Sequence, residues 1–309
     1  MLISTCKQNQ LHMPVYNPQE LDPRLRHNLL LGSISPRPIA LIGTVDDFGN
    51  NNLSPYSFFN VFSSNPPVAI FSPARRVRNN TTKDTLHNAM SNKECTINVV
   101  TYDLVHQVNL SSAEYGSEVD EFVKAGFTAL PSDTIAPMRV AESPVNMECI
   151  VKDVVHLGDE GGAGNLVVCE IKRIHVKDEV LMDNGFIDQQ AIDLVGRLGL
   201  NWWVRASGDA LFTVDAPKLG IGVDQIPHVI KNSTILSGND LGLLGNIQNL
   251  PTLQEIEEKA GEFELKRLIN NNPEGTELRE ALHEMASELL SEGKVMEAWK
   301  VLLIDKAAQ

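Results

Sequence analysis

The chain has 309 residues, a formal net charge of −14 and an apolar share of 42%. That share can form a hydrophobic core, so a wholly disordered chain is excluded, and the acidic balance argues against a nucleic-acid binder, which needs a basic face. No run of about 20 apolar residues predicts a membrane span. The polar start Met1–Gln10 contains no apolar signal segment, which indicates a cytoplasmic protein.

The first segment of the chain is predicted to be extended. Within residues 1–20, Pro14 and Pro18 oppose regular structure because proline lacks a backbone donor and has a fixed φ. Leu21–Leu31 then predicts a short helix that leads into the first strand.

Short apolar segments between residues 31 and 100 predict a strand-rich platform. Ile39–Val45 and Pro67–Phe71 are rich in apolar or β-branched residues and are bounded by proline and glycine, as buried strands are. Asp46–Asn50 has the residue types of a turn, which predicts a hairpin with the segment that follows, Asn52–Asn60. Glu94–Val100 predicts a further strand.

The pattern changes from strand to helix near Thr81 and Thr82. A threonine followed three residues later by Asp84 can cap a helix start, in a variant of the capping box. The unpaired N–H groups of that helix start, together with Lys83 and the arginines upstream, suit a phosphate group. An ordinary capped surface helix also explains the local pattern, so this stretch alone leaves both interpretations open.

The middle of the chain predicts two short helices and a long hairpin. Asp103–Ser112 and Ser117–Ala125 begin with capping residues and carry apolar side chains at helical spacing. Val145–Leu157 and Asn165–Val176 predict the two strands of the hairpin. The glycine-rich link 158–164 is not followed by a helix, so the dinucleotide-binding fingerprint is absent and a hairpin tip is predicted.

Three domains are predicted, with limits at 1–208, 209–251 and 252–309. Leu194–Arg205 closes the first domain, and its adjacent tryptophans Trp202 and Trp203 point to opposite faces if the chain is extended. Residues 209–251 are rich in Gly, Pro and Asn and predict an irregular connector. Thr252 with Glu255 forms a capping box that opens an α-helical C-terminal extension.

Cysteine and histidine spacing does not indicate a metal site. Cys6, Cys95, Cys149 and Cys169 form neither a zinc pattern nor a Cys-x-x-Cys pair. The last three lie in predicted strands and are interpreted as reduced, buried side chains. No metal ligands are predicted.

Several motifs resemble those of a known family. Pro36–Ala40, Asn52–Asn60 and Lys83–Thr85 are similar, in that order and spacing, to the flavin reductase-like family of FMN-binding split-barrel proteins, which includes flavoredoxins and oxygenase-associated reductases. Glu142–Pro144 and Gly196–Gly199 extend the resemblance over residues 20–208. It implies a mainly β fold, a six-stranded antiparallel Greek-key split barrel with short flanking helices, and a homodimer with FMN near its interface.

The resemblance also implies a cofactor site. A strand supplies polar backbone groups to the edge of the flavin ring. Lys83 and Thr85 are the best candidates for binding the phosphate. Arg37 is a candidate for the positive charge that stabilises the anionic reduced flavin. The carboxylate of Asp84 would repel phosphate and is expected to cap the helix or orient Lys83. The predicted cofactor-binding residues are Arg37, Ser54, Pro55, Tyr56, Ser57, Phe58, Asn60, Arg78, Thr82, Lys83, Asp84 and Thr85.

The implied function is an FMN-dependent oxidoreductase that transfers hydride from NAD(P)H to flavin or to a downstream acceptor. No protein acid or base is required because the flavin carries the chemistry, so no catalytic side chain is predicted. Three alternatives stay open: an electron carrier without a nicotinamide site, a scaffold whose helical tail recruits a partner, and a pyridoxamine-phosphate-oxidase-like enzyme. Fold analogy alone does not decide among them.

Overall fold

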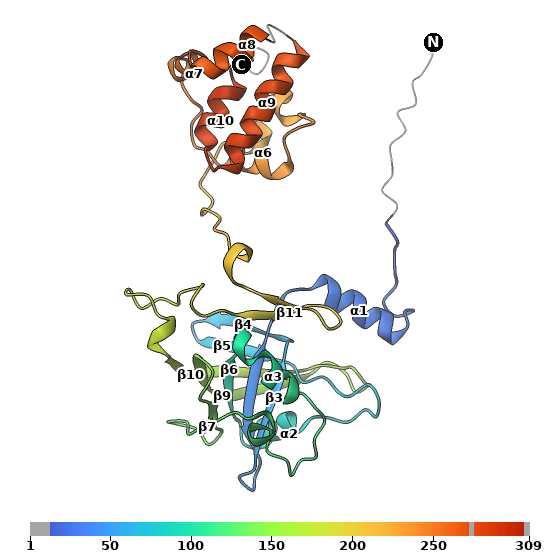
Figure 1. Cartoon of the computed structure of the whole chain (residues 1–309). Helices are drawn as coiled ribbons and strands as arrows, with labels where there is room; N and C mark the ends of the chain where they lie inside the picture. The colour runs from blue at the N-terminus through green and yellow to red at the C-terminus, as the bar shows by residue number, and fades with distance from the viewer. Residues whose placement is uncertain (1–12, 272–274, 306–309) are drawn as a thin grey trace. The chain divides into compact units, whose positions relative to one another are not determined.

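The computed structural model describes residues 13–271 and 275–305 (Figure 1). The chain divides into two units, one ending at Phe212 and one beginning at Thr213. Each unit contains its own hydrophobic cluster of buried side chains. The domain limit at residue 208 stays a prediction from the sequence. The predicted arm lies mostly outside the described residues, as does Cys6.

One antiparallel sheet of seven strands organises the first unit, in the order β3-β2-β6-β9-β10-β5-β4. Its strands are β2 (Ala40–Val45), β3 (Asn51–Tyr56), β4 (Phe59–Ser64), β5 (Pro67–Phe71), β6 (Glu94–Val99), β9 (Val145–His156) and β10 (Asn165–Val176). All neighbouring strands pair antiparallel. The antiparallel architecture agrees with a split barrel, but the sheet corrects the expected strand number from six to seven.

The additional strand arises from a division of the predicted segment Asn52–Asn60. Its first part is β3, which pairs with β2, and its last residues begin β4, which pairs with β5. These two strands lie at opposite ends of the strand order, yet only Ser57 and Phe58 separate them. Two residues span about 10 Å at most, so the sheet must curl until its two edges meet.

The predicted hairpins are confirmed. β2 and β3 are joined through Asp46–Asn50, where the Asp46 carboxylate accepts hydrogen bonds from the backbone N–H groups of Phe48 and Asn50. Gly49 has a φ of +88°, which glycine adopts without steric cost. β9 and β10 pair along their whole length, and their register shifts twice at bulges.

A second, three-stranded sheet has the order β1-β11-β12. It consists of β1 (Arg37–Pro38), β11 (Val195–Arg197) and β12 (Trp203–Arg205). The register places Arg37 directly opposite Arg197, and Arg197 opposite Trp203. This sheet therefore brings together two arginines that are distant in sequence. A further pair of short strands, β7 (Ala129–Leu130) and β8 (Arg139–Val140), forms a two-stranded sheet.

Four α-helices accompany these sheets in the described part of the first unit, namely α1 (Pro23–Ser33), α2 (Asp84–Ser91), α3 (Val105–Leu110) and α4 (Glu121–Ala125). The predicted threonine cap of α2 is wrong, because the N-cap residue is Lys83 and no side chain caps that helix end. α2 packs onto the sheet core through its buried Leu86 and Ala89. No side chain therefore caps the backbone N–H groups in the first turn of α2.

The second unit is helical. Its helices are α5 (His228–Lys231), α6 (Gly238–Gly245), α7 (Leu253–Ala260), α8 (Phe263–Asn271), α9 (Thr276–Ser291) and α10 (Val295–Leu302). The predicted capping box of Thr252 and Glu255 is present at α7. The segment predicted as an irregular connector differs, because it contains α5 and α6. Leu244 of α6 is buried in the core, and its carbonyl accepts a 3.0 Å hydrogen bond from the indole of Trp299.

Three cysteines meet inside the first unit. Cys95, Cys149 and Cys169 lie on the adjacent strands β6, β9 and β10 and are fully buried with free thiols. The sulfur atoms of Cys95 and Cys169 are 3.6 Å apart. No described helix is both long and apolar enough to cross a membrane.

Candidate functional site

Three hollows follow one another along β3 and the residues after it. The α2 hollow, of about 30 Å³, is lined by residues that include Ser54, Lys83 and Ser112. The Trp203 hollow, of about 170 Å³, shares Ser112 with it. The α1 cavity, of about 600 Å³, shares Ser57 and Arg197 with the Trp203 hollow. The shared residues make the three hollows one continuous stretch of surface.

The α2 hollow is formed where β3 meets the start of α2. Thr85 is fully buried, and its hydroxyl accepts a 2.9 Å hydrogen bond from the side-chain amide of Asn52 on β3. That amide also contacts the hydroxyl of Thr44 at 3.1 Å, which ties α2 to two strands. The first residues of α2 are thereby fixed against the strand that lines the rest of the site.

Charges of both signs surround the α2 hollow. Burial, and then the positive charge of Arg76, lowers the pKa of Lys83. Arg76 lies 3.6 Å from the carboxylate of Glu114, which also pairs with the exposed Arg78. Burial raises the pKa of Glu121, although its carboxylate accepts a 3.0 Å hydrogen bond from the N–H of Leu53. Lys83 thus forms no ion pair with a carboxylate in the described part of the chain.

Tyr56 has a buried hydroxyl without a hydrogen-bond partner among the described residues. The side chain is 6% exposed, its ring lies 5.4 Å from that of Phe71, and the ammonium of Lys83 is 5.1 Å from its centroid. Burial raises the pKa of Tyr56 to about 12. A buried hydroxyl without a partner is energetically costly, so this atom is a candidate ligand contact.

The Trp203 hollow combines an aromatic face with a cation. The guanidinium of Arg197 lies 5.1 Å from the ring of Trp203, and its Nη1 donates to the carbonyl of Trp202 at 2.9 Å. The two adjacent tryptophans differ in exposure, because Trp202 is 70% exposed while Trp203 lines the hollow. Apolar residues and backbone from Ile39, Pro55 and Val108 complete the walls.

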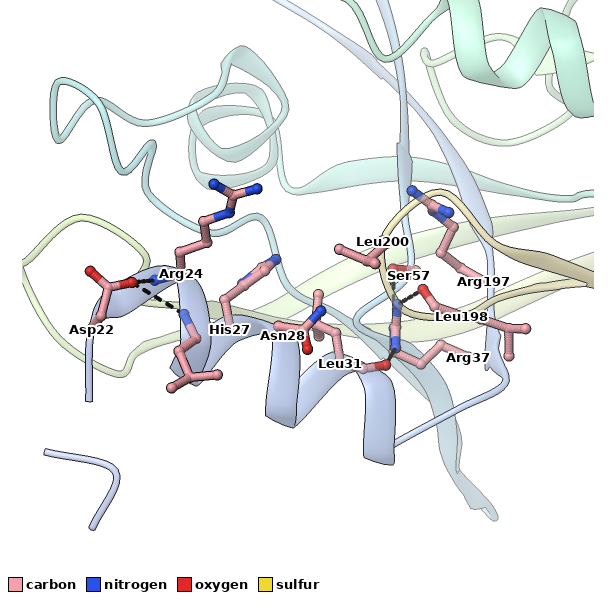
Figure 2. Close-up of a pocket in the computed structure, with 11 residues that line it drawn as sticks. Asp22, Arg24, His27, Asn28, Leu31, Arg37, Ser57, Arg197, Leu198 and Leu200 are labelled. Carbon is pink, nitrogen blue, oxygen red and sulfur yellow. Dashed lines mark hydrogen bonds between the residues drawn. The ribbon is translucent and has the colours of Figure 1, made fainter. Parts of the chain in front are cut away.

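Arg37 lies at the floor of the α1 cavity (Figure 2). It is 7% exposed, and its guanidinium donates to the carbonyls of Leu31, Ile34 and Leu198 at 2.7 to 2.9 Å. It also reaches the hydroxyl of Ser57 at 3.4 Å. Most of its donors therefore hold the end of α1 against the loop after β11.

The sequence profile of the flavin reductase like domain matches residues 31–190 of the chain. The matched segment contains β3 and the start of α2, which line the first two hollows. The chain belongs to the flavin reductase like family.

Relatives and solved structures of known source agree with this membership. A protein of uncharacterized function from Halalkalibacterium halodurans is 33% identical over 205 residues, which are 66% of this chain and 96% of that protein. Component B of nitrilotriacetate monooxygenase from Bacillus cereus is 28% identical, with a TM-score of 0.61, over 66% of this chain and 99% of that one. A protein assigned as a flavin reductase with a split barrel domain, from Shewanella frigidimarina, is 30% identical, with a TM-score of 0.56, over 64% and 96% of the two chains.

The structure brings most of the predicted cofactor residues of this family member together. The predicted residues that line the three hollows are Arg37, Ser54, Pro55, Tyr56, Ser57, Lys83, Asp84 and Thr85. Four others do not line them. Phe58 is 42% exposed, Asn60 accepts a hydrogen bond from the N–H of Val61, and Arg78 pairs with a glutamate. The hydroxyl of Thr82 contacts the imidazole of His87 at 2.7 Å.

Several lining residues were not among the predicted cofactor contacts, and two of them are the arginines Arg76 and Arg197. Arg76 borders the α2 hollow, whereas its neighbour Arg75 is bound to Asn80. Arg197 borders two hollows and belongs to the Gly196–Gly199 motif that contributed to the resemblance. That motif was the available signal for Arg197, but only the pairing of β1 with β11 shows which site it faces.

The flavin that the family binds fits the kinds of group present. Positive side chains and hydroxyls at one end suit a phosphate, and the unpartnered hydroxyl of Tyr56 suits a polar ligand atom. The α2 hollow is small, about the size of one water, so a phosphate requires the side chains of Arg76 or Lys83 to shift. Among the acids that line the hollow, Glu114 is ion-paired and burial raises the pKa of Glu121, while Asp84 has no ion pair in the described part of the chain.

Proposed function

We propose that this protein is an FMN-dependent oxidoreductase that takes hydride from NAD(P)H and passes electrons to flavin or to a downstream acceptor. One observation carries the proposal. Ser54–Ser57 and Lys83–Thr85, which are distant in sequence, share the continuous hollows along β3. Family membership supports a flavin as the ligand of these hollows.

The chain's residues divide the binding of FMN between two ends. Lys83, Thr85 and the first N–H groups of α2 would hold the phosphate, because a helix start and a cation both favour negative charge. Arg76 joins them when it leaves Glu114. When bound, FMN supplies the hydride-accepting and electron-delivering chemistry.

Residues of the Trp203 hollow would bind the flavin ring and stabilise its reduced form. Ser57 and the edge of β3 supply polar groups, and Trp203 with Pro55 supplies apolar surface. The guanidinium of Arg197 is the positive charge nearest to this surface among the lining residues, so it takes the role that the sequence assigns to Arg37. Arg37 instead acts as a positioning residue that fixes α1 beside the site.

A homodimer and transfer of electrons to a second protein belong to the same proposal. Several large apolar side chains near the site residues in sequence are exposed. They are Val61 and Phe62 on β4, and Leu200 and Trp202 after β11. Such a group of exposed apolar residues suits a second copy of the chain. The similarity to a monooxygenase component supports a role within a larger system.

Absorbance spectroscopy of the purified protein tests the proposal. We expect bound flavin bands that bleach when NADH or NADPH is added without oxygen, and steady-state oxidation of one of these donors in air. Binding of FMN without any oxidation of NAD(P)H would instead support the electron carrier. A colourless protein that also fails to bind FMN on titration would contradict the proposal.

A further inference from the structure

The α1 cavity has a charge opposite to that of the chain as a whole. Arg24, Arg37 and Arg197 line it, and Asp22 is the single acidic lining residue. The carboxylate of Asp22 is already occupied, since it caps α1 by accepting hydrogen bonds from the N–H groups of Arg24 and Leu25. A chain with a net charge of −14 thus carries a positively charged cavity.

Two of these arginines are brought together without an acidic partner. Arg37 and Arg197 are register partners in β1 and β11, and the charge of Arg197 adds to burial in lowering the pKa of Arg37. Neither guanidinium is ion-paired in the described part of the chain. Repulsion between two desolvated cations is relieved when an anion binds beside them.

The donors available for such an anion differ between the two arginines. Arg37 is committed to backbone carbonyls, so it contributes mainly a fixed charge. The guanidinium of Arg197 makes one hydrogen bond in the described part of the chain, from Nη1 to the carbonyl of Trp202, and it has five N–H donors in all. Figure 2 shows Arg197 extending to the same side of α1 as Arg24 and His27, both of which line the cavity.

Apolar side chains also line the cavity, beside the polar His27, Asn28 and Ser57. Leu25 and Leu31 of α1 face the cavity from one element, and Leu198 and Leu200 do so from the loop after β11. Inorganic ions gain nothing from such a surface, whereas a molecule with an apolar body buries area against it. A volume of about 600 Å³ lies within the range of sites for small organic ligands.

We infer that the α1 cavity is a binding site for an organic carboxylate, whose acid group meets Arg197 and whose apolar body contacts the leucines. The cavity adjoins the Trp203 hollow through Ser57 and Arg197. The placement of this ligand beside flavin rests on the proposed function, whereas its binding to the cavity does not.

Ligand-observed NMR titration of the full-length protein tests the site, with benzoate as the probe and benzyl alcohol as its uncharged counterpart. We expect benzoate to bind about tenfold more tightly than benzyl alcohol, because a charge-assisted hydrogen bond contributes on that scale. Inorganic phosphate at equal concentration should leave benzoate bound. Equal binding of the two probes, or displacement by phosphate, would overturn the inference.

Two variants and one matched control locate the probe. Arg197→Gln should weaken benzoate binding about tenfold or more. Arg24→Gln should weaken it by a smaller factor, and this exposed position on α1 leaves the core intact. Arg26→Gln removes the same charge from the same helix at a residue that does not line the cavity, so it should leave affinity unchanged. Equal losses in the Arg26 and Arg197 variants would show unspecific attraction and refute the site.

Flavin binding measured in the same samples separates this inference from the proposed function. Protein that binds FMN but shows no preference for benzoate contradicts only the carboxylate site. Protein that prefers benzoate but fails to bind FMN supports the carboxylate site and contradicts only the flavin proposal.

Discussion

Lys83 is the residue on which phosphate recognition depends most directly. It is half-buried beside the ring of Tyr56, has no ion-pair partner in the described part of the chain, and precedes the uncapped start of α2. We expect Lys83→Ala to weaken FMN binding by about tenfold to a hundredfold, the scale of a lost charged hydrogen bond. Riboflavin, which lacks the phosphate, should lose much less affinity.

Titration of flavin fluorescence measures both affinities for Lys83→Ala. Lys172→Ala, which removes a lysine from the surface of β10, is the matched control and should change neither. Equal losses for FMN and riboflavin in the Lys83 variant would exclude a phosphate contact.

Glu148 is a buried carboxylate with a structural role. It accepts hydrogen bonds from the N–H groups of Asp133 and Thr134 at 2.7 and 2.9 Å and from the imidazole of His175 at 2.8 Å. Burial opposes its ionisation, but the hydrogen bond from the Thr134 hydroxyl and these three bonds together lower its pKa from 4.5 to about 2. Its ionised form therefore stabilises the fold, fully above pH 4.5 and progressively less as the pH falls towards 2.

Replacement of Glu148 tests this pH dependence. Glu148→Gln should lower the free energy of unfolding at pH 7 by roughly 3 kcal/mol and flatten its fall between pH 4.5 and 2. Urea unfolding at several pH values measures both effects. The exposed Glu179→Gln serves as a control that should keep the wild-type profile. An unchanged acid dependence in Glu148→Gln would show that other groups determine it.

At the scale of residues, local sequence could identify the strand and the helix start of the site but not every arginine. Strand and helix signals mark the segments Ser54–Ser57 and Lys83–Thr85, and the family resemblance implied their cofactor role. The hydrogen bonds of Arg37 could not be foreseen, because its acceptors include a carbonyl 161 positions away. Tertiary pairing, rather than the neighbours in sequence, determines which arginine donates its hydrogen bonds to backbone carbonyls.

At the scale of elements, segments with strong periodicity were predicted well and their ends less well. The long hairpin strands appear as β9 and β10, and the helix predicted to open at the capping box of Thr252 appears as α7. The division of residues 52–60 could not be foreseen, because both parts have the same strand composition and differ only in their pairing partner. The start of α2 was predicted less well, because its N-cap residue is Lys83 and not a threonine.

At the scale of the whole molecule, the two units are separate in their cores. The relative from Halalkalibacterium halodurans matches this chain over 96% of its own length with 205 residues, so a protein of the first unit's size exists without the second. We expect a chain that ends at Phe212 to bind FMN within about threefold of the full-length affinity. Fluorescence titration of both chains measures this.

Thermal unfolding of the same two chains provides the control. The full chain should unfold in two transitions and the shortened chain in one, because two independent cores unfold separately. Loss of FMN binding on truncation, with the remaining transition intact, would assign part of the flavin site to the second unit. Such a result would contradict a site confined to the first unit.

The two-residue link between β3 and β4 connects the two edge strands of the sheet directly. A ligand that binds along β3 therefore also stabilises the contact between the two edges, because its binding free energy adds to the free energy that keeps the sheet closed. Ligand binding and the stability of the closed sheet are therefore thermodynamically linked.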